Sequence, residues 1–137
     1  MNSNLTRTLQ SIDDWNRHDL ESYRALYAPQ AVLHGLAPVS VDVDRALDGY
    51  RAFYTGFPDI RIDVLDSLIE AERIAMRFRI TGTHTGNFQG IPATGRSMDA
   101  QGITILHFSE GKVIERWNQL DQMGLMQQLG VIPTPGQ

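Results

Sequence analysis

The stretch from Gly111 to Gly130, G-K-V-I-E-R-W-N-Q-L-D-Q-M-G-L-M-Q-Q-L-G, changes its hydrophobic period halfway along. In its first half the residues alternate as in a β-strand, which places Val113 and Trp117 on the same side. In its second half methionine and leucine recur at helical spacing. The pattern therefore predicts a strand that runs directly into a short helix, with Asp121 at the junction.

Two interpretations of Asp121 are open. An aspartate just before a helix is a favoured N-cap, because its carboxylate accepts the free N–H groups of the first turn. In an extended strand, however, Asp121 would point to the same side as the indole of Trp117. At the edge of an apolar chamber, desolvation raises a carboxyl pKa from about 4 towards the working pH, which suits a general base. We expect a catalytic role for Asp121.

Composition places the chain among ordinary globular proteins. Its 137 residues predict one domain, residues 1–137, with a loose tail at 131–137. No apolar run approaches the ~20 residues of a membrane span and no secretory signal is apparent, so we expect a cytoplasmic protein without a membrane partner. A net charge of −4 and scattered basic residues predict no nucleic-acid partner. The sequence has no cysteine, which excludes thiol nucleophiles, disulfides and cysteine-ligated metals.

Helices come first in the predicted order and strands follow. Apolar residues at helical spacing predict helices at about residues 5–16, 20–28 and 47–57. A short strand at 31–35 lies between the second and third helices. Alternating residues then predict strands at about 60–70, 74–81, 97–108 and 112–120, with a glycine-rich loop at 86–95. This order predicts an α+β domain in which helices cover one face of a curved antiparallel sheet and enclose a conical hollow.

Four segments, in the same order, resemble the SnoaL-like polyketide cyclase family, whose members are also called ester cyclases. They are F-P-D-I-R (57–61), G-T-H-T-G-N-F-Q-G-I-P-A-T-G-R (82–96), E-G-K-V-I-E-R-W (110–117) and D-Q-M-G-L-M-Q-Q-L-G (121–130). The resemblance covers nearly the whole chain. It implies the cone-shaped NTF2-like (cystatin-like) fold of nuclear transport factor 2, ketosteroid isomerase, scytalone dehydratase and limonene epoxide hydrolase, with a homodimer formed through the sheet.

The resemblance also implies an activity. Characterised cyclases of the family use an aspartate at the end of the last strand as general acid/base for an intramolecular aldol closure, with no metal and no cofactor, and Asp121 matches it. His34 matches a polar pocket residue near the end of the first strand. The histidine that those cyclases carry on the strand before the E-G-K turn is replaced here by Thr104. The two-residue acid/base arrangement of the family is therefore incomplete in this chain.

Other side chains are candidates for ligand contact. The near-neutral pKa of a histidine would let His34 share a proton with a carboxylate, although a lone histidine on a strand is as often a hydrogen-bonded core residue. His84 either touches substrate or closes the glycine-rich loop. No H-x-x-x-H or H-x-H spacing occurs, so we expect no metal site. The predicted substrate-binding residues are Trp117, Thr104, His84, Phe53, Phe57 and Met76.

Three functions are compatible with these residues. The first is a cofactor-independent enzyme that moves a proton beside a carbonyl of a small apolar or polyketide-like molecule, giving aldol cyclisation, isomerisation or dehydration. In it Asp121 is the base, and His34 or Thr104 binds the enolate oxygen. The second lets Asp121 activate water, as in the epoxide hydrolases of this fold. The third is a non-catalytic domain for ligand binding or dimerisation.

Overall fold

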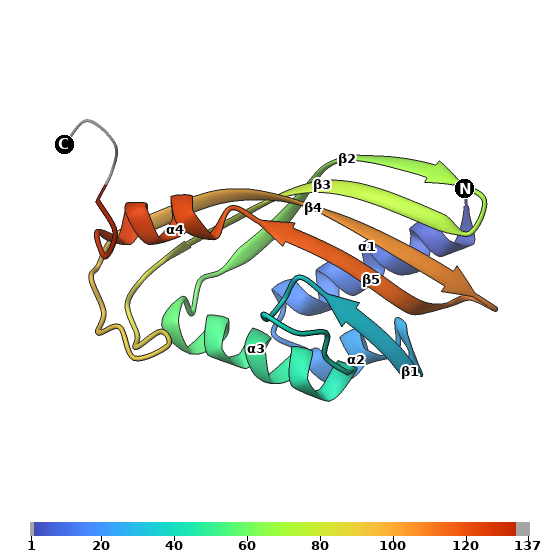
Figure 1. Cartoon of the computed structure of the whole chain (residues 1–137), viewed down its shortest axis with the longest axis horizontal. Coiled ribbons are helices and arrows are strands. Elements are labelled where there is room, and N and C mark those ends of the chain that lie inside the picture. The colour runs from blue at the N-terminus through green and yellow to red at the C-terminus, as the bar shows by residue number, and fades with distance from the viewer. Residues whose placement is uncertain (1, 134–137) are drawn as a thin grey trace.

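The computed structural model describes residues 2–133, in which four helices pack with one five-stranded sheet (Figure 1). The predicted α+β class is confirmed, with a curved sheet that does not close. Residues 131–133 belong to no helix or strand, and the rest of the predicted tail lies outside the described residues. In chain order the elements are α1 (Ser3–Asn16), α2 (Leu20–Arg24), β1 (Tyr27–His34), α3 (Val43–Gly56), β2 (Arg61–Glu70), β3 (Arg73–Thr83), β4 (Ser97–Ser109), β5 (Lys112–Leu120) and α4 (Gln122–Leu129).

The strands lie in the order β1-β5-β4-β3-β2. Strands β2 to β5 pair antiparallel, as predicted, whereas β1 pairs with β5 in parallel. The predicted boundary between the second helix and the first strand is wrong, because α2 ends at Arg24 and β1 already begins at Tyr27. Pro29 lies within β1, where an edge strand tolerates a residue that cannot donate to the ladder.

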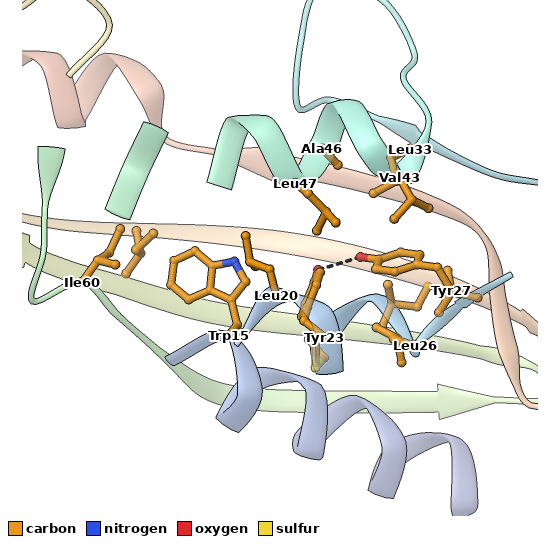
Figure 2. Packing of buried hydrophobic residues seen from close by; sticks show 14 of the residues in the cluster. Trp15, Leu20, Tyr23, Leu26, Tyr27, Leu33, Val43, Ala46, Leu47 and Ile60 are labelled. Carbon is orange, nitrogen blue, oxygen red and sulfur yellow. Dashed lines mark hydrogen bonds between the residues drawn. The ribbon is translucent and has the colours of Figure 1, made fainter. Parts of the chain in front are cut away.

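The inner face of the sheet carries the core. Ile74, Met76, Phe78 and Ile80 of β3 are all buried, which confirms the predicted alternation of that strand. Side chains of α1, α2 and α3 pack against this face, as Figure 2 shows for a cluster that includes Trp15. The helices and the sheet thus form two layers with one apolar interior between them.

Each of the four helices begins behind a side chain that caps it. Asn2, Asp19, Asp42 and Asp121 accept hydrogen bonds from free backbone N–H groups in the first turns of α1, α2, α3 and α4. The capping interpretation of Asp121 is therefore confirmed, with 2.9 Å between its Oδ1 and the Gly124 nitrogen. None of the described helices is long and apolar enough to cross a membrane.

Candidate functional site

A chamber of about 80 Å³ lies between the inner face of the sheet and the helices. Its wall is mostly apolar and includes Phe53 and Met76, as predicted. Two exposed residues of the wall, Gly35 and Gln122, mark its mouth between the end of β1 and the start of α4. Gly35 has a φ of +84°, and a Cβ there would come within 1.8 Å of the Asn118 carbonyl oxygen.

Arg116 is the one charged residue among the described residues that line the chamber. It is 8% exposed, and three hydroxyl groups hold its guanidinium. Nε donates to Oγ1 of Thr104 at 2.8 Å, and Nη1 donates to the hydroxyls of Tyr23 and Tyr27 at 2.8 and 2.6 Å. Within residues 2–133 no carboxylate forms an ion pair with it. The chamber therefore has a buried positive charge on its wall that only neutral oxygens stabilise.

The tyrosines around Arg116 form a chain of hydroxyl groups. Tyr23 and Tyr27 lie 2.7 Å apart between their oxygens (Figure 2), and the Tyr23 hydroxyl lies 3.3 Å from that of Tyr50. Burial raises the pKa of Tyr27 to about 12, although the positive charge of Arg116 acts in the opposite direction. Burial also raises the pKa of Tyr23. Both tyrosines are therefore neutral hydrogen-bonding groups near pH 7 and cannot serve as bases there.

A β-bulge in β5 explains why Arg116 faces the chamber. Val113 pairs with Phe108, while Glu115 pairs with the preceding residue of β4, so Ile114 has no opposing partner. The extra residue reverses the alternation of the strand. Val113, before the bulge, is fully buried, whereas Trp117, after the bulge, lies on the opposite face of the sheet. The prediction that Trp117 lines the hollow is therefore wrong, and Arg116 was missed. The adjacent apolar residues Val113 and Ile114 are the only sequence signal, and they fit a strand with or without a bulge.

Asp121 does not line the chamber; it lines a separate depression on the outer side of the sheet, together with Arg77 and Gln119. Its neighbours Leu120 and Gln122 both line the chamber, but the Asp121 side chain is exposed and engaged in capping α4. The expected desolvated position beside the indole of Trp117 is not found. Its assignment as the general base stays a prediction, now for an exposed carboxylate outside the chamber.

His34 lies on the outer face of the sheet. Its Nε2 is 2.7 Å from Oε2 of Glu115, and its ring stacks on Trp117 with 5.5 Å between ring centroids. The guanidinium of Arg73 lies over the same indole at 5.5 Å. His34 and Trp117 are thus brought together, but outside the chamber, so the expectation that they line the hollow is corrected.

The remaining predicted residues have supporting positions. Thr104 is buried and accepts from Arg116, so it holds the guanidinium in place without lining the chamber itself. His84 is fully buried, and its Nδ1 lies 2.9 Å from Oγ1 of Thr94, which confirms the loop-closing interpretation. Phe57 stacks on His84 at 5.1 Å and belongs to the core beneath that loop.

Comparison with known proteins gives one family. Residues 6–129 match the family described as SnoaL-like polyketide cyclase. Aklanonic acid methyl ester cyclase DnrD from Streptomyces peucetius is 33% identical over 63 residues, a match that covers 45% of this chain and 43% of DnrD. The matched region therefore spans less than half the length of that relative.

Solved structures show the same fold along almost the whole chain. AclR from Streptomyces galilaeus, a suggested hydroxylase, has a TM-score of 0.88 and 27% identity, with 96% of this chain and 83% of AclR covered. IdmH from Streptomyces antibioticus, a suggested polyketide cyclase, has a TM-score of 0.83 and 27% identity, with 93% of this chain and 99% of IdmH covered.

Proposed function

Because the chain belongs to the SnoaL-like polyketide cyclase family, we propose that it is a cyclase that closes a ring in a small, mostly apolar carbonyl compound held in the chamber. The observation that carries this proposal is an apolar chamber with hydrogen-bond donors on its wall, which Leu120 and Gln122, the two neighbours of Asp121, help to line. The family supports a cyclase-type function. The aldol reaction and its independence of a cofactor are our proposal.

In the proposed reaction Asp121 removes a proton from the carbon beside a carbonyl group. The resulting enolate carbon attacks a second carbonyl carbon of the same molecule and forms a carbon–carbon bond. The new alkoxide then takes the proton back from Asp121, so the product is an isomer of the substrate and no atom is gained or lost. Donors on the wall stabilise the negative oxygen of the enolate, and the apolar surface excludes water.

One observation favours a second candidate, a non-catalytic ligand-binding domain. Among the described residues that line the chamber there is no carboxylate and no imidazole. All acid/base chemistry therefore depends on Asp121 turning from its capping position towards the mouth. The same dependence applies to water activation of the epoxide-hydrolase kind.

The test is the substitution Asp121→Asn. Asparagine caps helices about as well as aspartate, so we expect the free energy of unfolding to change by less than about 0.5 kcal/mol. It cannot accept the substrate proton, so turnover should fall by roughly a hundredfold or more. The first substrate to assay is aklanonic acid methyl ester, the compound named for the relative DnrD, with the cyclised isomer separated by chromatography.

Asp42→Asn is the matched control. Asp42 caps α3 by the same contact, from its Oδ1 to a backbone nitrogen three residues on, but it is not part of the chamber wall. We expect this variant to cyclise at the wild-type rate. Wild-type turnover by Asp121→Asn would remove Asp121 from the mechanism, and tight binding of the ester without any turnover would favour the binding domain.

A further inference from the structure

The guanidinium of Arg116 has donors that the protein does not use. Of its five N–H groups, those on Nε and Nη1 are directed to three hydroxyl oxygens. Nη2 donates to no acceptor among the described residues, although Arg116 lines the chamber. Among the described residues, the fully enclosed polar side-chain atoms without a partner do not include Nη2. Because Nη2 has no partner, it must border open space. Two N–H groups of a buried cation are thus available to a molecule in the chamber.

The hydroxyl chain has one consistent direction, and it ends in the chamber. Tyr23 and Tyr27 both accept a hydrogen bond from Arg116, so each must donate its single proton elsewhere. Tyr23 donates to the Tyr50 oxygen, which leaves Tyr27 to donate to Tyr23. The proton of Tyr50, a residue of the chamber wall, has no acceptor in the described part of the chain. Each bond in such a chain polarises the next and strengthens the terminal donor.

Trp15 adds an independent observation. It is 1% exposed and lines the chamber, and its Nε1 is a buried donor without a hydrogen-bond partner in the described structure. Its ring meets that of Tyr50 edge to face, with 5.8 Å between centroids. Nη2 of Arg116, the Tyr50 hydroxyl and the indole N–H thus have no acceptor among the described residues, and of these three donors the indole N–H is fully enclosed.

A buried cation without a counter-ion is unfavourable, because the interior stabilises charge less well than water. From this cluster of unused donors we propose that the chamber binds an acidic molecule, whose anionic carboxylate or phenolate oxygen accepts from Nη2 of Arg116 and from the Tyr50 hydroxyl. The inference rests on the proposed function and names its substrate class, an apolar body of about one ring inside the chamber with one anionic oxygen. It requires binding only and not turnover.

The test compares benzoate with benzamide, two probes of the same shape that differ in charge. The chain has two tryptophans, so Trp117→Phe on the outer face leaves Trp15 as the only tryptophan, a fluorescent reporter on the chamber wall. We expect benzoate to shift the Trp15 emission and to bind roughly ten- to hundredfold more tightly than benzamide, as for a hydrogen bond to a charged group. Equal affinity of the two probes would overturn the proposal.

Substitutions assign the preference to Arg116. Arg116→Gln should bring benzoate to the affinity of benzamide, whereas Arg77→Gln, which removes an equal charge on the exposed side of β3, should keep the preference. If both variants lose it equally, general surface charge is responsible and the proposal fails. Tyr50→Phe removes one donor and keeps the cation, so it should weaken benzoate by about three- to tenfold and benzamide less. If Arg116→Gln does not fold, the Tyr50→Phe variant and the comparison of benzoate with benzamide in the wild type still test the proposal.

A phenol probe separates the two kinds of acid. 4-Nitrophenol changes colour on ionisation, and a site that stabilises the phenolate should lower its apparent pKa in the wild type but not in Arg116→Gln. If the apparent pKa of 4-nitrophenol is lowered, phenols belong to the substrate class. If it is unchanged while benzoate still binds more tightly than benzamide, the class is restricted to carboxylates. Because these measurements involve no turnover, an anion preference without cyclisation contradicts only the proposed function. Cyclisation without an anion preference contradicts only this inference.

Discussion

Tyr27 holds its hydroxyl group in the interior, against the guanidinium of Arg116. Burial raises its pKa from 10.0 to about 12, with the charge of Arg116 opposing the shift. Because the folded-state pKa is raised, this stabilising contribution is complete below the unfolded pKa near 10 and is lost as pH rises through about 12. At about 1.4 kcal/mol for each pKa unit, we expect Tyr27 alone to lower the free energy of unfolding in urea by about 3 kcal/mol over that range.

The variant Tyr27→Phe is the control for this loss. It lacks the titrating hydroxyl and one acceptor of Arg116, so it should be less stable than the wild type at pH 7. Between about pH 10 and about pH 12 its free energy of unfolding should decline less steeply, because one buried acid is gone. Identical slopes for the two proteins would show that Tyr27 does not titrate in this way.

Single residues were the hardest part to predict, for a local reason. The capping geometry of Asp121 follows from its place before a helix and could be predicted, but its exposure depends on the phase of β5. That phase is reversed by one bulged residue, Ile114, which moves Arg116 inward and Trp117 outward. Thr104 was predicted to contact substrate, but it accepts a hydrogen bond from Arg116 and does not line the chamber, and this contact depends on the inward orientation that the bulge gives Arg116.

The helix α4 is fastened to β4 by the side chain of Gln128. Its Nε2 donates to the Asp99 carbonyl oxygen at 2.8 Å, and its Oε1 accepts from the Asp99 nitrogen at 2.6 Å. Because α4 begins at Gln122 on the mouth of the chamber, we expect Gln128→Ala to loosen the mouth as well as the helix. Loss of these two exposed hydrogen bonds should cost about 1–2 kcal/mol. Amide hydrogen exchange should become faster in α4 and stay unchanged in β3.

Gln127→Ala, one residue earlier in α4, is the matched control. Gln127 donates only a long bond of 3.3 Å to the Pro133 carbonyl oxygen and makes no contact of this kind with β4 among the described residues. Exchange in α4 should therefore remain close to that of the wild type. Faster exchange in both variants to the same extent would attribute the effect to helix propensity and not to the bond with Asp99.

Elements of regular period could be predicted from the sequence, and pairings between distant segments could not. The alternation of β3 and the glycine turn at 109–111 identify neighbouring antiparallel strands, because each lies next to its partner along the chain. The pairing of β1 with β5 joins Tyr27 to Val113, far apart in sequence. Nothing local in either strand specifies that partner, so the parallel edge of the sheet appears only in the structure.

At the scale of the whole molecule, the outer face of the sheet bears a row of mostly apolar side chains that crosses every strand. Successive register partners define this row as Leu68, Ala75, Ile105, Trp117 and His34. Leu68 is 76% exposed and Ile105 is 38% exposed. Extended apolar surface of this kind marks an interaction site, and a two-fold axis lets one row pack on a second copy of itself. We therefore predict a homodimer formed through the sheet.

The variant Ile105→Lys tests this dimer. A lysine in the middle of the row would place a charge in the interface, where burial without a partner is unfavourable, so the dimer should dissociate. Light scattering after size-exclusion chromatography should give the wild type twice the 15.4 kDa of one chain and the variant a single chain mass. Val39→Lys, at an apolar residue that is 70% exposed in the loop after β1, should keep the double mass. If the wild type has the mass of one chain, the predicted dimer is contradicted. If the Ile105→Lys variant keeps the mass of two chains, the dimer interface does not include this row.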